Sequence, residues 1–322
     1  MQYTICNEIE NALFFTLDTV RSCGIGYNGT ELYWIKDYHG EPIDADKIDE
    51  QRNIWRKMFQ EGNQPEQCKH CHLLLTKDWE QNKKFNLLVI AHRTKCSCNC
   101  IYCHFRWKKR LWNTREAYNI MPVLNDLEEK KLLADDLHIS VSGGECTEYP
   151  DNEFEDIANF VLKKKCKMSV YSSGINFSPT LAKCLSAGLC DLVISADSGT
   201  RYVYEKIKRV RHFGDVWKNI KKYAEAATPD GIYGRMTVKY VIVYGMNSSQ
   251  KAFHDFIKQC RKAKVKHIRI AVEYNWWNRH KDSEIPPRII SLVKYIQKFN
   301  DEFSIEPTEF GTTLFEIANK QS

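Results

Sequence analysis

A short stretch of the 322-residue chain carries an unusual density of cysteines. Cys96, Cys100 and Cys103 are spaced Cys-x3-Cys-x2-Cys, and Cys98 adds a further thiol inside the same stretch. Three thiolates on one loop can ligate three irons of a cubane iron–sulfur cluster. The fourth iron would then lack a protein ligand and could bind a substrate or a cofactor. The spacing therefore indicates a cluster with an open iron.

Zinc is the competing interpretation of the same cysteines. Six of the thirteen cysteines lie between positions 68 and 103, and the pairs Cys68-x2-Cys71 and Cys100-x2-Cys103 also match the spacing of structural zinc sites. The cysteines alone favour iron–sulfur and zinc equally, with burial of structural thiols a weaker alternative. The rest of the chain has to decide between the two metals.

The composition is that of a globular protein whose thiols are reduced. Thirteen cysteines are too few for a disulfide-stapled secreted domain, and a net charge of +6 does not demand a nucleic-acid partner. The longest apolar runs, Leu87–Ala91 and Tyr240–Tyr244, are strand-sized, so no membrane span is expected. The first residues carry acid where a secretory signal carries base. We therefore expect a cytoplasmic protein, in which clustered cysteines bind metal or do chemistry.

The elements that would position the cysteine loop follow from the hydrophobic pattern after Phe85. Strand-like runs alternate with helix-like segments, as in successive βα units around a parallel sheet. The predicted strands are Phe85–His92, Leu137–Val141, Met168–Ser172, Leu192–Ala196, Thr237–Tyr244 and His267–Tyr274. The predicted helices are Thr114–Ala134, Phe154–Lys164, Pro179–Ala187, Arg201–Ile207, Val216–Ala227 and Gln250–Ala263, with N-caps at Thr114, Ser178 and Ser249. Six units suit an α/β fold that is either an open doubly wound sheet or a partial barrel.

The two ends of the chain differ from this pattern. Phe14–Leu17 and Glu31–Ile35 alternate like short antiparallel strands, and Ala45–Gln60 has helical character. The tail is predicted to begin with a helix at Arg288–Phe299 and to end in an amphipathic segment at Thr312–Asn319. The predicted domains are an N-terminal α+β module at 1–84, a barrel at 85–302 and a C-terminal extension at 303–322.

Polar and glycine residues follow the predicted barrel strands. The second strand runs into Ser142-Gly143-Gly144-Glu145, at the carboxyl edge that also carries the cysteine loop. Glycines let a ligand approach the backbone, so main-chain carbonyls and Glu145 could accept hydrogen bonds from an ammonium group, although a plain turn explains the motif taken alone. The later strands end in Tyr171–Gly174, Ser195–Gly199, Tyr244–Asn247 and Glu273–Asn275. Together these ends predict one ligand pocket across the top of a barrel.

These motifs are similar to those of the radical S-adenosylmethionine (SAM) superfamily, and the resemblance covers about residues 85–300. Members of that family carry a Cys-x3-Cys-x2-Cys loop after the first strand of a partial (βα)6 barrel and a Gly-Gly-Glu after the second. The matching residues are Cys96, Cys100, Tyr102, Cys103, Gly143, Gly144 and Glu145. The stretch 193–209 also resembles the peptide-modifying branch of the family. The resemblance favours iron–sulfur over zinc and a partial (βα)6 barrel over an open doubly wound sheet.

The resemblance implies a [4Fe–4S] cluster on Cys96, Cys100 and Cys103, with SAM on the open iron. An electron from a donor such as flavodoxin or ferredoxin would cleave SAM to methionine and a 5′-deoxyadenosyl radical, which abstracts a hydrogen atom from the substrate. The implied SAM contacts are Tyr102 for the adenine, Gly143, Gly144 and Glu145 for the methionyl ammonium, Ser195 and Asp197 for the ribose with Ser173 beside them, and Arg209 for the methionyl carboxylate.

Several cysteines lie outside the family pattern. Cys98 falls within the motif, where we expect an incidental thiol and where an alternative ligand is the other interpretation. Cys146 follows Gly-Gly-Glu where the family often has proline, and we expect a small buried side chain there rather than a substrate-facing thiol. Four others are expected in the core: Cys166, Cys184, Cys190 and Cys260.

The four cysteines ahead of the barrel form a complete ligand set: Cys6, Cys23, Cys68 and Cys71. Residues 1–72 resemble the SPASM and Twitch extensions of peptide-modifying radical SAM enzymes, which carry auxiliary clusters. Here the extension precedes the barrel instead of following it. The resemblance implies a second, auxiliary [4Fe–4S] cluster, with zinc as the alternative occupant.

These features predict a radical SAM enzyme that acts on a peptide or protein. The alternative enzyme would oxidise or rearrange a small polar molecule such as a sugar or nucleotide sugar. A different class is a zinc-stabilised protein that binds a polyanion through the basic stretch Arg106–Arg110. The other basic runs, Lys163–Lys165 and Lys206–Arg211, are interpreted as solvated helix faces.

Overall fold

The computed structural model describes residues 2–23, 32–69, 71, 74–78, 84–103, 117–228, 233–280, 285–308 and 310–320. The chain divides into two compact units, unit 1 with residues 1–94 and 112–169 and unit 2 with residues 95–111 and 170–322. The cysteine loop belongs to unit 2 and the Gly-Gly-Glu motif to unit 1. The predicted boundaries at residues 84 and 302 divide the chain differently and stay a prediction.

Unit 1 is built on a mixed sheet. Its strands are β1 (Gln2–Cys6), β2 (Ala12–Phe15), β3 (Thr19–Arg21), β4 (Tyr33–Lys36), β5 (Leu74–Asp78), β6 (Phe85–Ile90) and β7 (Leu133–Val141). The strand order is β7-β6-β2-β3-β4, with β6 parallel to both neighbours and β3 antiparallel to both of its own. An antiparallel pair joins β1 to β5. Part of the predicted N-terminal module therefore continues the sheet that contains the first barrel strand.

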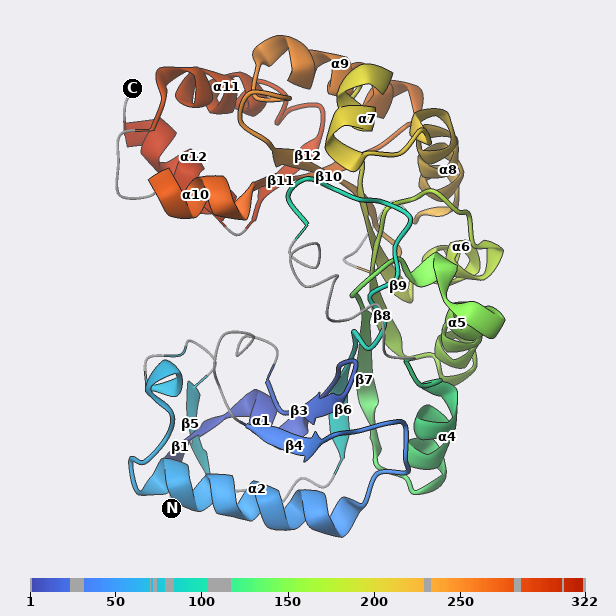
Figure 1. Ribbon diagram of the computed structural model, residues 1–322, viewed down its shortest axis with the longest axis vertical. Helices are drawn as coiled ribbons and strands as arrows, with labels where there is room; N and C mark the ends of the chain where they lie inside the picture. Colours follow the sequence, from blue (N-terminus) through green and yellow to red (C-terminus); the bar gives the residue numbers. More distant parts are fainter. Residues whose placement is uncertain are drawn as a thin grey trace. The chain divides into compact units, whose positions relative to one another are not determined.

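The helices of unit 1 flank this sheet (Figure 1). They are α1 (Asn7–Asn11), α2 (Ala45–Gln60), α4 (Met121–Glu129) and α5 (Glu153–Lys164), with short 3-10 turns at Glu66–Cys68, Cys146–Glu148 and Pro150–Asn152. The helix predicted at Ala45–Gln60 is confirmed by α2, which has the same bounds. It begins there because the Asp44 carboxylate caps its N-terminus by accepting from the backbone N–H groups of Asp46 and Lys47.

Unit 2 contains the later βα units (Figure 1). Its strands are β9 (Cys190–Ser195), β10 (Met236–Ile242), β11 (His267–Val272) and β12 (Ser304–Pro307), and the boundary between the units falls within β8 (Lys167–Ser172). Its helices are α6 (Pro179–Ser186), α7 (Arg201–Lys208), α8 (Phe213–Ala226), α9 (Gln250–Lys262), α10 (Tyr274–His280), α11 (Pro287–Gln297) and α12 (Phe310–Lys320). Strands β9, β10, β11 and β12 follow one another in this order in the sheet and are parallel to each other. The predicted α/β fold of the partial (βα)6 barrel type is thereby confirmed.

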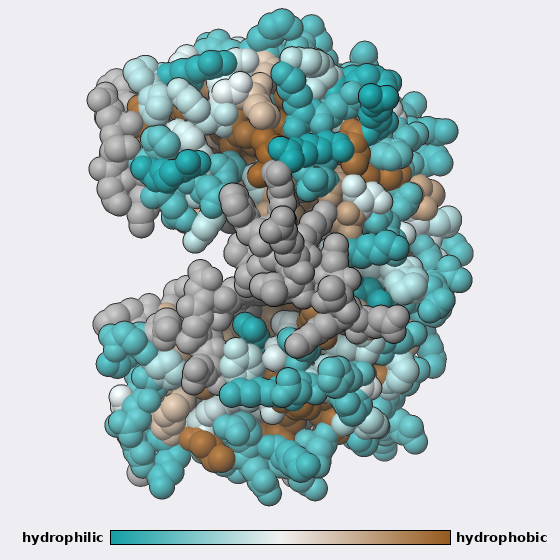
Figure 2. All heavy atoms as spheres, viewed as in Figure 1, coloured by the Kyte–Doolittle hydropathy of each residue, from teal (hydrophilic) through white to brown (hydrophobic). Residues whose placement is uncertain are grey.

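The apolar runs that predicted these strands form the core. Strands β9 and β10 are buried along almost their whole length, as expected for parallel strands covered on both faces. The four cysteines predicted in the core are buried as well: Cys166, Cys184, Cys190 and Cys260. On the face drawn in Figure 2, hydrophilic residues cover most of the surface. No helix in the described part of the chain has the length and hydropathy needed to span a bilayer.

The predicted helix caps at Ser178 and Ser249 are confirmed by side-chain hydrogen bonds to the backbone N–H groups of Leu181 and Ala252. Several predicted boundaries are wrong. The helix predicted at 114–134 begins only at Met121 and ends at Glu129, because Lys131 adopts a positive φ of 57° and the chain enters β7 at Leu133. The strand predicted from Leu137 therefore begins four residues earlier, and the one predicted to Tyr244 ends at Ile242. The predicted start of that helix, at residue 114, lies outside the described residues.

The last barrel strand is also shorter than predicted. It ends at Val272, because the Glu273 carboxylate accepts from the backbone N–H groups of Asn275 (2.9 Å) and Trp276 (2.8 Å) and so starts helix α10. Tyr274 therefore begins a helix instead of ending a strand.

Candidate functional site

The cysteine loop, residues 95–103, is attached to the C-terminal turn of helix α7. The backbone N–H of Asn99 donates to the carbonyl of Lys208 (3.0 Å), and that of Ile101 donates to the carbonyl of Ile207 (3.0 Å). Ile101 and the Tyr102 ring also pack on a buried cluster that includes Ile207 and Val241. Unit 2 therefore holds the loop through both its backbone and its apolar side chains.

A buried charged triad lies against the same loop. Lys208 and Asp197 are 2% and 0% exposed, and the Lys208 ammonium lies 2.5 Å from the Asp197 carboxylate. The ammonium also donates to the Tyr102 hydroxyl (2.8 Å), which in turn donates to Asp197. Desolvation alone would lower the pKa of Lys208, but the carboxylate more than offsets it and holds that pKa well above its usual value. Lys208 is therefore protonated and forms a buried ion pair with Asp197 beside the loop.

Asp197 is fixed on all sides. Its other carboxylate oxygen accepts from the backbone N–H of Val241 (2.9 Å), and its own carbonyl accepts from the side-chain amide of Asn247 (2.8 Å). Asp197 also adopts a positive φ of 58° directly after β9. The ribose contact implied for Asp197 stays a prediction, and the structure shows that its carboxylate already serves Lys208 and Tyr102.

The thiols of the loop differ in environment. Cys96, Cys100 and Cys103 are half-buried, whereas Cys98 is buried. Hydrogen bonding to the Cys98 thiol is the main cause that lowers the pKa of Cys100; burial and Asp197 oppose this shift, and the Lys208 ammonium supports it. The same thiol–thiol hydrogen bonds, to Cys100 and then to Cys96, raise the pKa of Cys98. Cys100 is therefore converted to a metal-binding thiolate more readily than Cys98.

The three half-buried thiols fit an iron–sulfur cluster by their chemistry. Thiolates are the usual ligands of such clusters, and a backbone hydrogen bond from the Cys103 N–H to the Cys100 carbonyl (3.1 Å) closes the turn that carries two of them. Within the described ranges, the side chains of histidine, cysteine, aspartate and glutamate form no ready-made metal site of three or more ligands. Support for the cluster therefore comes from the thiol ligands and their partial exposure, and not from thiols already arranged around a metal.

The glycine turn after β7 lies in unit 1 and contains Gly143, Gly144 and Glu145. Gly143 has a φ of 106°, which side chains rarely allow, and a Cβ there would lie 2.5 Å from the carbonyl oxygen of Arg93. The N–H of Gly144 donates to that same carbonyl (2.8 Å). A glycine is therefore required at position 143 both by its backbone conformation and by the close approach of another chain segment.

Glu145 is almost completely buried, with 1% exposure. One of its oxygens accepts from the Thr147 hydroxyl (2.8 Å) and from the Thr147 backbone N–H (3.3 Å). Cys146 is likewise buried, as expected from the sequence, and its thiol lies 3.9 Å from the same oxygen. The carboxylate predicted to receive the methionyl ammonium is thus held in a fixed position by its own turn.

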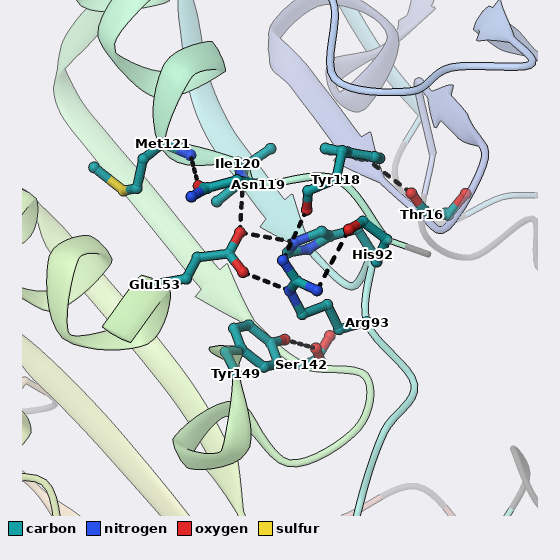
Figure 3. Close-up of polar contacts among 11 residues, drawn as sticks. Thr16, His92, Arg93, Tyr118, Asn119, Ile120, Met121, Ser142, Tyr149 and Glu153 are labelled. Carbon is teal, nitrogen blue, oxygen red and sulfur yellow. Dashed lines mark hydrogen bonds and ion pairs between the residues drawn. The ribbon is translucent and has the colours of Figure 1, made fainter. Parts of the chain in front are cut away.

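A second buried network lies beside the glycine turn in unit 1 (Figure 3). The Glu153 carboxylate, 0% exposed, accepts from the Arg93 guanidinium, from His92 Nε2 (3.1 Å) and from the backbone N–H of Ile120 (2.7 Å). Burial alone would raise the pKa of Glu153, but these donors more than offset it and lower that pKa. Burial also lowers the pKa of His92. The network therefore centres on a buried anion.

The remaining predicted SAM contacts lie in unit 2. Ser195 is the last residue of β9, and the Ser173 hydroxyl accepts from the backbone N–H of Ile175 (3.4 Å). Arg209 is exposed and ends helix α7 with a positive φ of 58°. The structure places each of them at the carboxyl end of a strand or the end of a helix, and their contacts with SAM stay predictions.

Three of the N-terminal cysteines are close together in unit 1. Cys6 ends β1 and pairs in register with Leu74, three residues after Cys71. The Cys71 N–H donates to the Cys68 carbonyl (3.3 Å). Burial raises the pKa of Cys6, and it raises that of Cys68 to about 11, with the neighbouring thiols adding to both shifts. Cys23 is half-buried in the same unit.

A cavity of about 530 Å³ adjoins the cysteine loop within unit 2. Its lining is both apolar and polar: Ile101, Tyr102, Val243, Glu273, Asn275, Asn278 and Arg279. The lining residues come from the loop, from the carboxyl ends of β10 and β11 and from helix α10. A ligand pocket at strand ends was predicted from the sequence, and this cavity lies at two of them.

Sequence reasoning missed the residues that hold the two motifs in place. Lys208 belongs to a basic run interpreted as a solvated helix face, but it is buried, so that interpretation is wrong for this residue. One sequence feature was consistent with its burial: Lys208 follows Tyr204 by four positions, so the two residues share a helix face, and Tyr204 is buried. Arg93 and Glu153 are sixty positions apart, and no local pattern links them. The basic stretch Arg106–Arg110 lies outside the described residues.

Comparison with known proteins places the chain in a family. The radical SAM superfamily model matches residues 90–273, more than half of the chain, and the chain therefore belongs to that superfamily. The family implies a [4Fe–4S] cluster and SAM. No curated protein matches the sequence.

Solved structures share the fold at low sequence identity. SuiB from Streptococcus suis has a TM-score of 0.51 and 14% identity, over 82% of this chain and 54% of SuiB. The enzyme anSMEcpe with bound AdoMet has a TM-score of 0.50 and 12% identity, over 70% of this chain and 64% of that one. A second SuiB structure, with the precursor peptide SuiA bound, has a TM-score of 0.49 and 14% identity, over 81% and 63%. The chain thus spans about half to two thirds of the length of these proteins.

Proposed function

We propose that this protein is a radical SAM enzyme in which Cys96, Cys100 and Cys103 hold the SAM-binding [4Fe–4S] cluster. When bound, that cluster supplies the electron that cleaves SAM to a 5′-deoxyadenosyl radical able to abstract hydrogen from a substrate. The observation that carries the assignment is the cysteine loop itself. Its three thiols are half-buried, one has a lowered pKa, and the loop is fixed by hydrogen bonds to helix α7.

Different residues of the chain would support the cluster and bind SAM. The triad of Tyr102, Asp197 and Lys208 keeps the loop in one conformation and neutralises part of the charge that its thiolates bring. The glycine turn and Glu145 offer backbone carbonyls and a carboxylate to the methionyl ammonium. Burial of Glu145 excludes water from this contact and strengthens it.

The assignment is tested on anaerobically reconstituted protein. Cys96→Ala, Cys100→Ala and Cys103→Ala should each abolish the brown colour that dithionite bleaches and the release of 5′-deoxyadenosine from SAM. Cys184→Ala is the matched control, because that cysteine is buried in helix α6 of the same unit. If single substitutions in the loop leave both signals intact while the control behaves like wild type, the ligand assignment is wrong.

We propose a peptide or protein as the substrate. The cavity beside the cysteine loop combines the apolar Ile101 and Val243 with the side-chain amides of Asn275 and Asn278, a mixture suited to side chains and amide groups of a peptide. Tyr244 and Tyr274, which directly follow lining residues, are 46% and 47% exposed and offer further contact area. The resemblance of residues 193–209 to the peptide-modifying branch supports the same class.

The substrate class is tested by co-expression with short peptides encoded beside the gene. The expected result is a mass change in one peptide that depends on Cys100. Turnover of sugars or nucleotide sugars with no change in any peptide would overturn the peptide assignment and leave the radical chemistry in place. Flavodoxin and ferredoxin in the cytoplasm are the electron donors we propose, and replacement of dithionite by either protein checks this.

We also propose an auxiliary [4Fe–4S] cluster on Cys6, Cys23, Cys68 and Cys71. Its support is the register that brings Cys6 to the strand following Cys71, together with the mutual effect of these thiols on their pKa values. Reconstituted protein should contain about eight irons per chain, falling to about four in Cys68→Ser/Cys71→Ser. Cys166→Ser, a buried cysteine of the same unit, should leave the content unchanged. Zinc in place of iron, or about four irons in both proteins, would contradict the proposal.

A further inference from the structure

The glycine turn of unit 1 is shaped by a residue outside it. The Arg93 carbonyl accepts from the Gly144 N–H (2.8 Å) and lies where a Cβ on Gly143 would fall. Any displacement of the Arg93 backbone therefore moves the turn or opens a gap beside it. The position of Arg93 decides where the carbonyls of the turn point.

The Arg93 side chain is tied down at three places (Figure 3). Its guanidinium donates to the Glu153 carboxylate and to the backbone carbonyls of Tyr118 (3.1 Å) and Ala117 (3.4 Å). The side chain is 13% exposed and its partner Glu153 is 0% exposed, so solvent screens the pair little. Such a fork of donors has a fixed geometry that a lysine cannot reproduce.

Glu153 anchors this arrangement to the rest of unit 1. It is the first residue of helix α5, and it also accepts from His92 and from the N–H of Ile120 just before helix α4. One carboxylate thus joins the end of β6 to the starts of two helices. The Arg93 backbone cannot shift without breaking contacts to a buried charge.

Tyr149 supports the turn from another direction. Its hydroxyl donates to the carbonyl of Ser142 (3.1 Å), the residue before Gly143, and its ring lies 5.6 Å from the Arg93 guanidinium. Arg93 therefore acts on the turn twice, at its middle through its own backbone carbonyl and at its start through the Tyr149 ring that its guanidinium contacts.

We propose that Arg93 and Glu153 are positioning residues for SAM, acting through the backbone of the glycine turn. This inference rests on the proposed function, in which the turn receives the methionyl ammonium. Hydrogen bonds depend steeply on donor–acceptor geometry, so a tilt of the turn weakens the ammonium contact. The cysteine loop makes none of these contacts and keeps its cluster.

The test compares Arg93→Lys with Arg235→Lys. Arg235 is also 13% exposed and pairs with two acids, Asp191 and Glu306, but it belongs to unit 2, whereas the turn belongs to unit 1. We expect Arg93→Lys to raise the Kd for SAM at least tenfold, measured by titration calorimetry on reconstituted protein. Its kcat at saturating SAM should fall less than threefold, and its iron content and cluster reduction potential should match wild type. Arg235→Lys should leave the Kd unchanged.

A second variant keeps the test valid if Arg93→Lys does not fold. Glu153→Gln keeps the shape of the side chain and removes its charge, and it should also raise the Kd for SAM. A folded Arg93→Lys or Glu153→Gln protein with a Kd within twofold of wild type would overturn the inference, as would equal effects of Arg93→Lys and Arg235→Lys. Failure of the wild-type protein to bind SAM when its cluster is present would overturn the proposed function instead.

Discussion

The two units hold their motifs with buried charges in different ways. In unit 1 the central group is an anion, Glu153, and its donors fix a backbone turn. In unit 2 the central group is a cation, Lys208, whose partners Asp197 and Tyr102 fix a loop of thiols. Glu153 orders a backbone turn, whereas Lys208 also lies close enough to the thiols of the loop to lower the pKa of Cys100.

The difference shows in the effect on neighbouring groups. The Lys208 ammonium helps to lower the pKa of the Cys100 thiol, so its charge reaches the metal-binding atoms directly. The Arg93 guanidinium is paired with Glu153, as Lys208 is with Asp197, but it influences its motif through the position of the Arg93 carbonyl. Unit 2 thus acts by electrostatics and unit 1 by geometry, and variants can separate the two.

The largest effect is expected from Lys208→Met in unit 2. Removal of the ammonium leaves the Asp197 carboxylate buried and unpaired, which costs about 3–5 kcal/mol of the free energy of unfolding. Urea denaturation measures it. The double variant Lys208→Met/Asp197→Asn should recover part of the loss, because no charge is then left without a partner.

The exposed ion pair of Arg261 and Glu302 provides the control for Lys208. Its two carboxylate contacts are 2.6 and 2.7 Å long, but both side chains are over 40% exposed. Arg261→Met should therefore leave the denaturation midpoint unchanged. A similarly small effect of Lys208→Met would show that water reaches the triad and that the contrast between the units is wrong.

The sequence predicted the two motifs better than it predicted their supports. Cysteine spacing and a Gly-Gly-Glu are local patterns, so the loop after β6 and the turn after β7 could be located without a structure. The strands could be located because buried parallel strands read as continuous apolar runs. Their supports are long-range pairs, such as Arg93 with Glu153, and no short window contains both partners.

The prediction that the basic run 206–211 is a solvated helix face was wrong for a physical reason. Lysine and arginine are rarely buried unless they are paired, so a basic run is interpreted as solvated by default. Lys208 escapes that rule only because Asp197, eleven positions earlier, turns inward from the end of β9. Burial of Lys208 could therefore have been predicted only from the position of Asp197. The inward orientation of Asp197 depends on its positive φ, which the amino-acid composition does not reveal.

The next largest effect is expected from Gly143→Ala in unit 1. The methyl group would meet the Arg93 carbonyl at 2.5 Å and would force alanine into a φ of 106°, together costing about 2–3 kcal/mol. SAM affinity should fall with stability, because the turn itself is displaced. Gly62→Ala is the control, since its φ is also positive at 73° but nothing lies within 4 Å of the added carbon. Equal losses for both glycines would mean that strain alone, and not the Arg93 contact, defines the turn.

The buried network around Glu153 in unit 1 should also make the free energy of unfolding depend on pH. The folded-state pKa of His92 is lowered by burial, so below about pH 6.5 the unfolded chain takes up a proton that folded His92 refuses, and stability falls. The pKa of Glu153 is lowered as well, so its contribution is present above about pH 4.3 and is lost as pH falls further, through its folded pKa.

The measurement is the free energy of unfolding between pH 8 and about pH 2, with the expected fall of about 1.4 kcal/mol for each unit by which a pKa is lowered. His92→Gln should remove the part of the fall that begins near pH 6.5 and leave the more acidic part. A wild-type curve that is flat from pH 8 to 5 would show that His92 titrates normally, which its complete burial argues against.

The smallest effect is expected from Tyr149→Phe, and it separates support of the turn from general stability. The variant loses one hydrogen bond to the Ser142 carbonyl, worth about 1 kcal/mol. Tyr118→Phe loses a matching bond in the same unit, from its hydroxyl to the Thr16 carbonyl (3.0 Å), and Thr16 is not part of the turn. Both should lower the melting temperature alike, while only Tyr149→Phe weakens SAM binding. If the two variants bind SAM equally well, the turn is held by the Arg93 carbonyl alone, and the geometric role of unit 1 narrows to a single backbone contact.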